Sequence, residues 1–201
     1  MCHHATTPYY RFMPRWEAGA EARLTRAAYE LYFERGFEDV TVAEIAARAG
    51  LTKRTFFRYF ADKREVLFSG AATFQDTVVS AVISAPEGLA PIDAVVAALS
   101  AGGSGLTELG EGARARQRLI DGSTDLQERE MIKMATLTAA IDGALQLRRV
   151  PESVASLTAQ AGVAVFQTAF DRWARREGSA DFSDLIYEAL DELRTAIRPN
   201  G

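Results

Sequence analysis

The chain of 201 residues carries a net charge of −4 and is 48% hydrophobic, which is the composition of an ordinary globular protein with one large or two small cores. Its only cysteine, Cys2, and its only histidines, His3 and His4, lie at the extreme N-terminus. The body of the chain therefore offers no disulfide, no His- or Cys-based zinc site and no catalytic site of the Ser-His-Asp or Cys-His kind. No apolar run approaches the roughly 20 residues of a membrane-spanning helix, so we expect a cytoplasmic protein without cofactor or metal.

Helix signals run from residue 17 to residue 84. Cap residues and apolar side chains spaced three and four apart predict helices over 17–35, 42–49, 53–60 and 63–84. Gly36 ends the first helix, and Thr41 with Glu44 forms a capping-box pattern before the second. Thr52 and Asp62 stand where they can cap the other two. The second and third helices are short and joined by a glycine-containing turn, which is typical of a helix-turn-helix motif whose second helix lies in the major groove of DNA.

Cations gather on the third of these helices and in the turn that follows, at Lys53, Arg54, Arg58, Lys63 and Arg64. Aromatic residues four apart on this helix are expected to face the core, so that the face with Arg54 and Arg58 points outward. Residues 1–69 hold 11 Lys and Arg against 9 Asp and Glu, whereas the rest of the chain holds 12 against 18. This pattern predicts double-stranded DNA as the partner, with a merely solvated basic face as the alternative.

The stretch TVAEIAARAGLTKRTFFRYFADKREVL resembles the DNA-binding domain of the TetR family of transcriptional regulators, and the match covers about residues 17–69. The resemblance implies DNA contacts at Thr41, Thr52, Lys53, Arg54, Thr55, Arg58, Tyr59 and Lys63. Of these, the two threonines at the helix starts and Lys63 are implied phosphate contacts. The chain departs from the family at Phe57, where a tyrosine is common, and at Tyr59, where histidine is frequent. Because Phe57 has no hydroxyl, it cannot donate a hydrogen bond to a phosphate, which leaves it an apolar contact or a packing role.

We expect an all-α protein of about nine helices with three parts. These are a flexible N-terminal tail over 1–16, the helix-turn-helix domain over 17–69, and a regulatory ligand-binding and dimerisation domain over 70–201. Breaks in the helical pattern divide the last part near 86–91, 102–105, 122–124, 150–151 and 178–181. This part resembles the regulatory domain of the family more weakly, and is similar to a branch whose ligand-binding domain is described as acyl-CoA-like.

Two sets of apolar residues are candidates for binding surfaces in the regulatory domain. The effector pocket is expected at Phe74, Val78, Val95, Leu99, Met131, Met134, Leu137 and Ile141, although each of these also fits an ordinary core. The last two helical segments carry apolar stripes at Val163, Phe166, Phe170, Trp173, Ile186, Leu190, Leu193 and Ile197. The resemblance implies that these stripes form the interface of a homodimer, and the alternative is that they fill the core of one protomer. Three arginines, Arg114, Arg116 and Arg118, are candidates for contact with the phosphate of an acyl-CoA effector.

The function expected from these patterns is that of a ligand-responsive transcriptional regulator. We expect a repressor that binds a palindromic operator as a dimer and is released by a small apolar or amphipathic effector. A transcriptional activator of the same fold fits the sequence equally well. A helical enzyme or carrier for a lipid-like ligand is disfavoured, because the chain body has no His or Cys and no phosphate-binding glycine loop.

Overall fold

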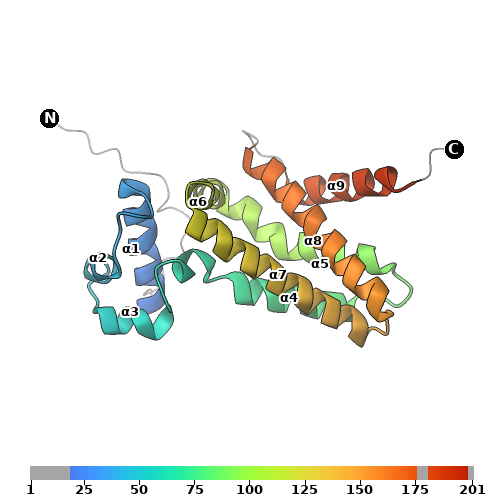
Figure 1. Ribbon diagram of the computed structural model, residues 1–201, viewed down its shortest axis with the longest axis horizontal. Coiled ribbons are helices and arrows are strands. Elements are labelled where there is room, and N and C mark those ends of the chain that lie inside the picture. Colours follow the sequence, from blue (N-terminus) through green and yellow to red (C-terminus); the bar gives the residue numbers. More distant parts are fainter. Residues whose placement is uncertain (1–18, 176–180, 199–201) are drawn as a thin grey trace. The chain divides into compact units, whose positions relative to one another are not determined.

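The regular elements in the computed structural model, which describes residues 19–175 and 181–198, are all helices (Figure 1). In chain order the α-helices are α1 (Ala20–Arg35), α2 (Val42–Arg48), α3 (Lys53–Tyr59), α4 (Ala71–Ser84), α5 (Pro91–Leu109), α6 (Glu111–Asp121), α7 (Thr124–Leu147), α8 (Glu152–Arg175) and α9 (Phe182–Ala196). A short 3-10 helix, η2 (Glu65–Phe68), lies between α3 and α4. The prediction of an all-α chain with nine helices is confirmed for these residues. The tail expected over 1–16 lies outside them.

The helices form two compact units, and neither unit is continuous in sequence. Among the described residues, the first unit contains residues 19–69 together with Glu111–Gln127, and the second contains Gly70–Gly110 together with residues 128–175 and 181–198. The sequence analysis had assigned 70–201 as a whole to a second domain. The structure differs, because α6 and the first turn of α7 belong to the unit that contains α1, α2 and α3.

Packing explains why α6 belongs to the first unit. Ala115 and Ile120 on α6 are buried. The Arg116 Nε donates a hydrogen bond to the Leu67 carbonyl at 2.8 Å, and its guanidinium carbon lies 4.8 Å from the centre of the Phe68 ring. Arg116 was a candidate for contact with an effector phosphate, but in the structure it joins α6 to η2 within the first unit. The α6 sequence is amphipathic, which predicts a helix but does not show against which unit its apolar side packs.

The core of the first unit lies between α1, α2 and α3. Leu24, Ala28 and Leu31 form the buried side of α1 at spacings of three and four residues. Ile45 from α2 and Phe56 from α3 are fully buried as well. The sequence pattern therefore predicted this part of the fold correctly, because each short helix has one apolar side and the caps fix where it begins.

The segment predicted as one long helix over 63–84 is divided in the structure. Asp62 accepts hydrogen bonds from the backbone N–H groups of Arg64 at 2.8 Å and Glu65 at 3.2 Å, so the predicted cap is present. The helix that it begins is η2, which ends at Phe68, and α4 starts only after Gly70. The cap at Asp62 was therefore predicted correctly, but it starts a single turn instead of a long helix.

One stretch, residues 65–84, is long and apolar enough by composition to span a membrane, with a mean hydropathy of 1.4 over its most apolar 18 residues. The expectation that the chain has no such stretch was therefore wrong. Length and composition alone are weak grounds for a membrane span, because core helices of globular proteins pass the same test. In the structure this stretch is two helices, and Val66, Val78 and Val82 within it are buried by protein.

α5 is the central helix of the second unit and packs against α4, α8 and α9 (Figure 1). The expected break near residues 102–105 is absent, because α5 continues to Leu109. The glycines have a packing role instead. A Cβ atom on Gly103 would lie 2.5 Å from the Phe182 ring, and one on Gly102 would lie 2.9 Å from the Phe74 ring. Glycine here allows aromatic rings to approach the helix backbone closely, although it lowers helix propensity.

Candidate nucleic-acid interface

Helix α2 begins with the capping box that the sequence predicted. The Thr41 Oγ1 accepts the backbone N–H of Glu44 at 3.3 Å, and the Glu44 carboxylate accepts the Thr41 N–H at 2.9 Å. Arg35 donates to the same carboxylate at 2.8 Å. The hydrogen bond from Arg35, followed by those from Thr41, lowers the pKa of Glu44 to about 2. The carboxylate therefore stays ionised at a more acidic pH than an unpartnered glutamate would, and the cap of α2 is kept there.

The turn between α2 and α3 is set by glycine and by a second threonine cap. Gly50 has a φ of +65°, in the left-handed region that glycine enters without steric cost. The Leu51 N–H reaches back to the Ala46 carbonyl at 2.8 Å, which closes the end of α2. The Thr52 Oγ1 then accepts the Thr55 N–H at 3.1 Å and starts α3. These bonds fix the direction of α3 relative to α2, as a helix-turn-helix motif requires.

The side of α3 that faces away from the core carries the candidate DNA contacts. Phe56 and Phe60 are buried, which holds the opposite side of the helix outward. Lys53, Arg54 and Arg58 are exposed, and within the described residues none of the three forms an ion pair. Three cations on seven residues therefore remain available to an anionic partner.

The last turn of α3 adds an aromatic pair to this surface. The Arg58 Nη2 donates to the Tyr59 hydroxyl at 2.9 Å, and the guanidinium carbon lies 4.9 Å from the centre of the Tyr59 ring. Phe57, beside them, is also exposed. Thr55 is half-buried, and its hydroxyl lies 3.0 Å from that of Thr52. The surface thus combines charged, aromatic and hydroxyl groups on one short helix.

The geometry of Lys63 does not fit the phosphate contact that the sequence analysis implied. Its ammonium donates hydrogen bonds to the carbonyls of Phe37 at 2.8 Å, Glu38 at 3.1 Å and Val40 at 3.1 Å. These bonds use all three of its donors. The ammonium also lies 4.3 Å from the centre of the Phe37 ring. Lys63 therefore holds the turn between α1 and α2 in place, and its position next to the recognition helix in sequence gave no sign of this.

Two further cations near α3 also belong to the scaffold. Arg64 pairs with Asp62 at 2.7 Å. Arg48 at the end of α2 pairs with Glu34 at 2.9 Å and with Glu30 at 3.2 Å, both on α1. The hydrogen bond from Arg48 lowers the pKa of Glu34. Of the five cations that the sequence grouped together, the three on α3 therefore form the outward surface.

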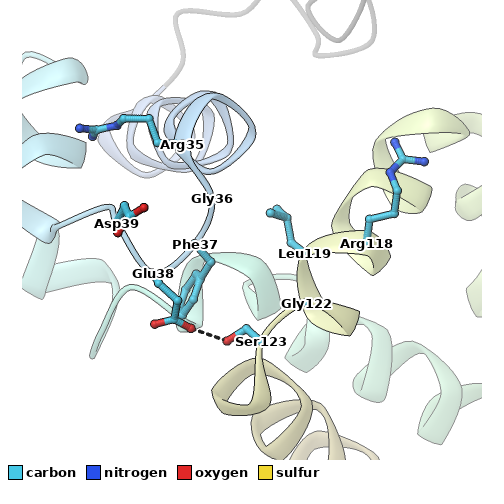
Figure 2. Close-up of a pocket in the computed structure, with 9 residues that line it drawn as sticks. All are labelled: Arg35, Gly36, Phe37, Glu38, Asp39, Arg118, Leu119, Gly122 and Ser123. Carbon is cyan, nitrogen blue, oxygen red and sulfur yellow. Dashed lines mark hydrogen bonds between the residues drawn. The ribbon is translucent and has the colours of Figure 1, made fainter.

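An open hollow in the first unit lies between the α1–α2 turn and the end of α6 (Figure 2). Its lining includes Arg35 at the end of α1, Glu38 from the turn and Arg118 from α6. The buried Ser123 donates its hydroxyl to Glu38 at 2.7 Å, across the hollow shown in Figure 2. Sequence reasoning did not anticipate this contact, because no local pattern relates residues 85 positions apart. The lining mixes charged side chains with Phe37 and Leu119, and it includes none of the residues that were expected to form the effector pocket.

Two family models match the chain. The model for bacterial regulatory proteins of the tetR family matches residues 24–69, and the model for the MftR C-terminal domain matches residues 89–198, which is more than half of the chain. The chain belongs to the TetR family. Membership in this family makes it a transcriptional regulator and not an enzyme, as predicted.

Individual TetR-family relatives agree with this assignment. The HTH-type transcriptional regulator TcmR of Streptomyces glaucescens is 35% identical over 79 residues, which is 39% of this chain and only 35% of TcmR. MftR of Mycobacterium tuberculosis, named as a mycofactocin biosynthesis transcriptional regulator, is 28% identical over 181 residues, or 87% of this chain and 89% of MftR. The crystal structure of the TetR-family repressor FadR from Thermus thermophilus with lauroyl-CoA has a TM-score of 0.52 and 22% identity, and covers 90% of this chain and 96% of FadR. The last similarity shows a shared fold.

The residues expected to line an effector pocket of this TetR-family protein lie mostly inside the second unit. Val78, Val95, Leu99, Leu137 and Ile141 are buried. Phe74 and Met134 are half-buried, and the Phe74 ring is tilted by 43° against the Phe166 ring of α8, with the ring centroids 5.5 Å apart. Met131 is 67% exposed, so its place on the surface does not fit a role in an interior pocket. Met131 and Met134 are three residues apart, which separates their side chains by about 60° around α7. That difference leaves Met131 exposed while Met134 is partly covered by the protein.

The residues expected at the dimer interface are mostly core residues of one protomer. Five of them, Val163, Phe166, Trp173, Ile186 and Leu190, are buried within the chain. Phe170 and Leu193 are half-buried, and Ile197 is exposed. α8 and α9 pack on each other and on α5, so the buried five belong to the core of one protomer, which is the alternative that the sequence analysis left open. In this TetR-family protein the outward sides of α8 and α9 instead carry other residues, among them Leu157 and Tyr187.

Proposed function

We propose that this TetR-family regulator is a cytoplasmic repressor that binds a palindromic operator as a homodimer and leaves it when a small apolar or amphipathic molecule binds. The observation that carries the proposal is the outward side of α3, where Lys53, Arg54 and Arg58 are exposed and have no carboxylate partner among the described residues. Such a helix, following a tightly closed turn, suits the major groove of DNA. An activator with the same DNA contacts remains the second candidate.

The proposed contacts divide into those that read bases and those that position the protein. Arg54 and Arg58 lie one turn apart, and each guanidinium can bond both major-groove acceptors of a guanine. Lys53, Thr55 and Tyr59 flank them on the same helix. Thr41 and Thr52 are exposed at the starts of α2 and α3 and are proposed phosphate contacts. Lys63 contributes indirectly, by holding the α1–α2 turn.

The proposed effector site is the apolar interior of the second unit, between α4, α5, α7 and α8. Phe74 and Val78 of α4 face Gly102 of α5, and Val95 lies against Gly162 of α8. An apolar chain is the kind of ligand that such a lining can take up, since it offers few hydrogen-bonding groups. FadR of Thermus thermophilus shares this fold, and its crystal structure contains lauroyl-CoA. An acyl-CoA is therefore the first compound to test.

The proposed dimer uses the outward sides of α8 and α9. Leu157 on α8 is 69% exposed, and Tyr187 on α9 and Ile197 just after it are exposed as well. Where exposed apolar side chains form a contiguous patch, they mark an interaction surface. Two-fold symmetry would place two recognition helices in successive major grooves, which requires a palindromic operator.

Release of the operator is proposed to be a population shift. A ligand changes an equilibrium only by binding one conformation more tightly than the other. The effector would therefore favour a dimer geometry in which the two α3 helices no longer match the spacing of the half-sites. This requires no new contact between effector and DNA.

The proposal is tested with the full chain and a pool of random DNA duplexes. Selection should enrich one palindromic sequence, and fluorescence anisotropy should give it at least about 10³-fold tighter binding than random duplex at physiological salt. Lauroyl-CoA should weaken operator binding about tenfold or more, whereas coenzyme A alone should not. A promoter reporter that contains the operator should be silenced by the protein. Failure to enrich any sequence would overturn DNA recognition, and increased expression of the reporter would favour the activator.

Two variants distinguish sequence-specific contacts from a general effect of positive charge on DNA affinity. Arg54→Ala with Arg58→Ala should abolish enrichment, because both candidate base contacts are lost. Arg149→Ala removes an exposed arginine of the second unit that lies outside α8 and α9, and it should leave operator binding unchanged. An equal loss of affinity per charge removed in the two variants would mean that only the net charge matters.

A further inference from the structure

Phe57 is an exposed aromatic residue in the middle of the candidate DNA surface. It is 56% exposed, whereas Phe56 and Phe60 on the same helix are buried. Its ring meets the Phe56 ring edge-on, with centroids 5.5 Å apart and an interplanar angle of 85°. This contact holds the ring in place on one side and leaves the rest of it open. Phe57 is therefore not a core residue, and the packing role left open by the sequence does not fit.

The position of Phe57 on α3 places it beside the cations. Successive residues of an α-helix are about 100° apart, so Phe57 lies on the same flank as Lys53, one turn earlier. On the helix surface it is next to the row formed by Arg54 and Arg58. A helix inserted with that row toward the bases would bring the Phe57 ring to the base edges or to the wall of the groove.

The chemistry of the ring limits what it can recognise. A phenyl group has neither a hydrogen-bond donor nor an acceptor, so it cannot bond a phosphate oxygen or the polar edge of a base. The 5-methyl group of thymine is the apolar group that the major groove displays. Tyr59, the other exposed aromatic residue of α3, differs because its hydroxyl is engaged by Arg58.

We propose that Phe57 reads the 5-methyl group of one thymine in each half-site of the operator. The inference rests on the proposed function, since it assumes that α3 lies in the major groove. It adds a base preference that depends on apolar contact instead of on a hydrogen bond. The Phe56 ring positions Phe57 for this contact, because its edge restricts the orientation of the exposed ring.

The experiment replaces each thymine of the selected operator in turn by deoxyuridine, which lacks only the methyl group. With the full parent chain, one replacement in each half-site should weaken binding about fourfold per methyl group. With Phe57→Ala, operator binding should be weaker, and the same replacement should have no further effect. Phe57→Leu keeps an apolar side chain and should keep part of the sensitivity. Circular dichroism checks that each variant is folded, and the exposure of Phe57 favours this.

The outcomes distinguish the inference from the function on which it rests. If Phe57→Ala weakens operator and random duplex equally, with no deoxyuridine position losing its effect, the ring contacts the DNA backbone and the inference is wrong. If Phe57→Ala binds like the parent, the ring is only solvated and the inference is likewise overturned. If no sequence is enriched by the parent, the proposed function itself fails. Phe57→Tyr adds a further check, since a general gain in affinity on all sequences would indicate that the ring lies beside a phosphate.

Discussion

Arg54 and Arg58 are separated by one helical turn on the outward side of α3, a spacing at which two guanidinium groups can reach neighbouring base pairs. Arg54→Ala should weaken operator binding by about 1–3 kcal/mol, because a bidentate contact to a base is lost. Preference at one base pair in each half-site should be reduced as well. Binding of all single-base operator variants by anisotropy measures both effects. Equal weakening on operator and random duplex would mean that Arg54 contacts only phosphate.

Lys53 and Lys63 provide a matched pair, since the same substitution should act on different properties. Lys63→Met loses three hydrogen bonds from an ammonium to backbone carbonyls and should lower the free energy of unfolding by roughly 2 kcal/mol. Lys53→Met removes an exposed charge and should leave stability nearly unchanged.

Urea unfolding followed by circular dichroism gives the stabilities, and the slope of log affinity against log salt gives the number of phosphates neutralised. Lys53→Met should lower that slope by about 1 per half-site, or about 2 for the dimer, and Lys63→Met should not change it. If Lys63→Met lowers the salt slope and leaves the free energy of unfolding unchanged, Lys63 contacts DNA and does not hold the α1–α2 turn.

At the residue level, the sequence predicts which side of α3 faces outward but not what every cation binds. Phe56 and Phe60 are four residues apart, which places both aromatic rings on one side of α3, and both are buried. Lys63 has no such pattern. Its partners are carbonyls of residues 37–40, more than 20 positions away, and backbone carbonyls are the same for every amino acid. The exposure of Phe57 is also visible only in the structure, because the sequence does not show whether a phenylalanine next to a buried one is covered.

Two glycines test how tightly the helices of the second unit pack. Gly162 on α8 lies against α5, where an added Cβ would come within 2.4 Å of the Val95 side chain. Gly143 on α7 has nothing within 4 Å of the same position. Gly162→Ala should destabilise the protein by roughly 1–3 kcal/mol through overpacking. Gly143→Ala should stabilise it by about 0.5–1 kcal/mol, because alanine favours the helix.

Thermal unfolding of the two variants beside the parent compares their stabilities. Shifts of opposite sign are expected. A stabilised Gly162→Ala variant would mean that α5 and α8 can separate without cost, and the close approach between them would then not matter to the fold.

At the level of helices, the sequence predicted where a helix starts better than where it ends or which helix it packs against. Thr41, Thr52 and Asp62 all cap the elements that follow them, because capping depends on residues three positions apart. The glycines at 102–105 suggested a break, yet they lie inside α5. A glycine that ends a helix and one that admits a neighbouring ring look the same in sequence, and the ring of Phe182 that approaches Gly103 is far away in the chain.

For the whole molecule, the proposed dimer can be tested on one helix. Leu190 on α9 was expected at the interface, but it is 1% exposed within the protomer, whereas Tyr187 three residues earlier is 45% exposed. Leu190→Asp buries an unpaired charge and should cost more than about 4 kcal/mol, unfolding the second unit. Tyr187→Asp should keep the helix content of the parent and yield monomers with weak operator binding.

Sedimentation, circular dichroism and operator affinity are measured together for both variants. Tyr187 is outside the proposed interface if Tyr187→Asp remains a dimer with parental affinity. A folded, monomeric Leu190→Asp would in turn contradict the burial of Leu190 in the protomer.

The division of the first unit also bears on the order in which the protein is made. The chain leaves this unit at Ser69 and returns at Glu111, so its later part, with Arg116 and Ser123, is synthesised after α4 and α5. A nascent chain that has emerged only to residue 69 has the whole recognition helix but lacks α6, against which η2 packs. The DNA-binding unit is therefore completed on the ribosome only when residue 127 has emerged, by which time the first two helices of the regulatory unit are already made.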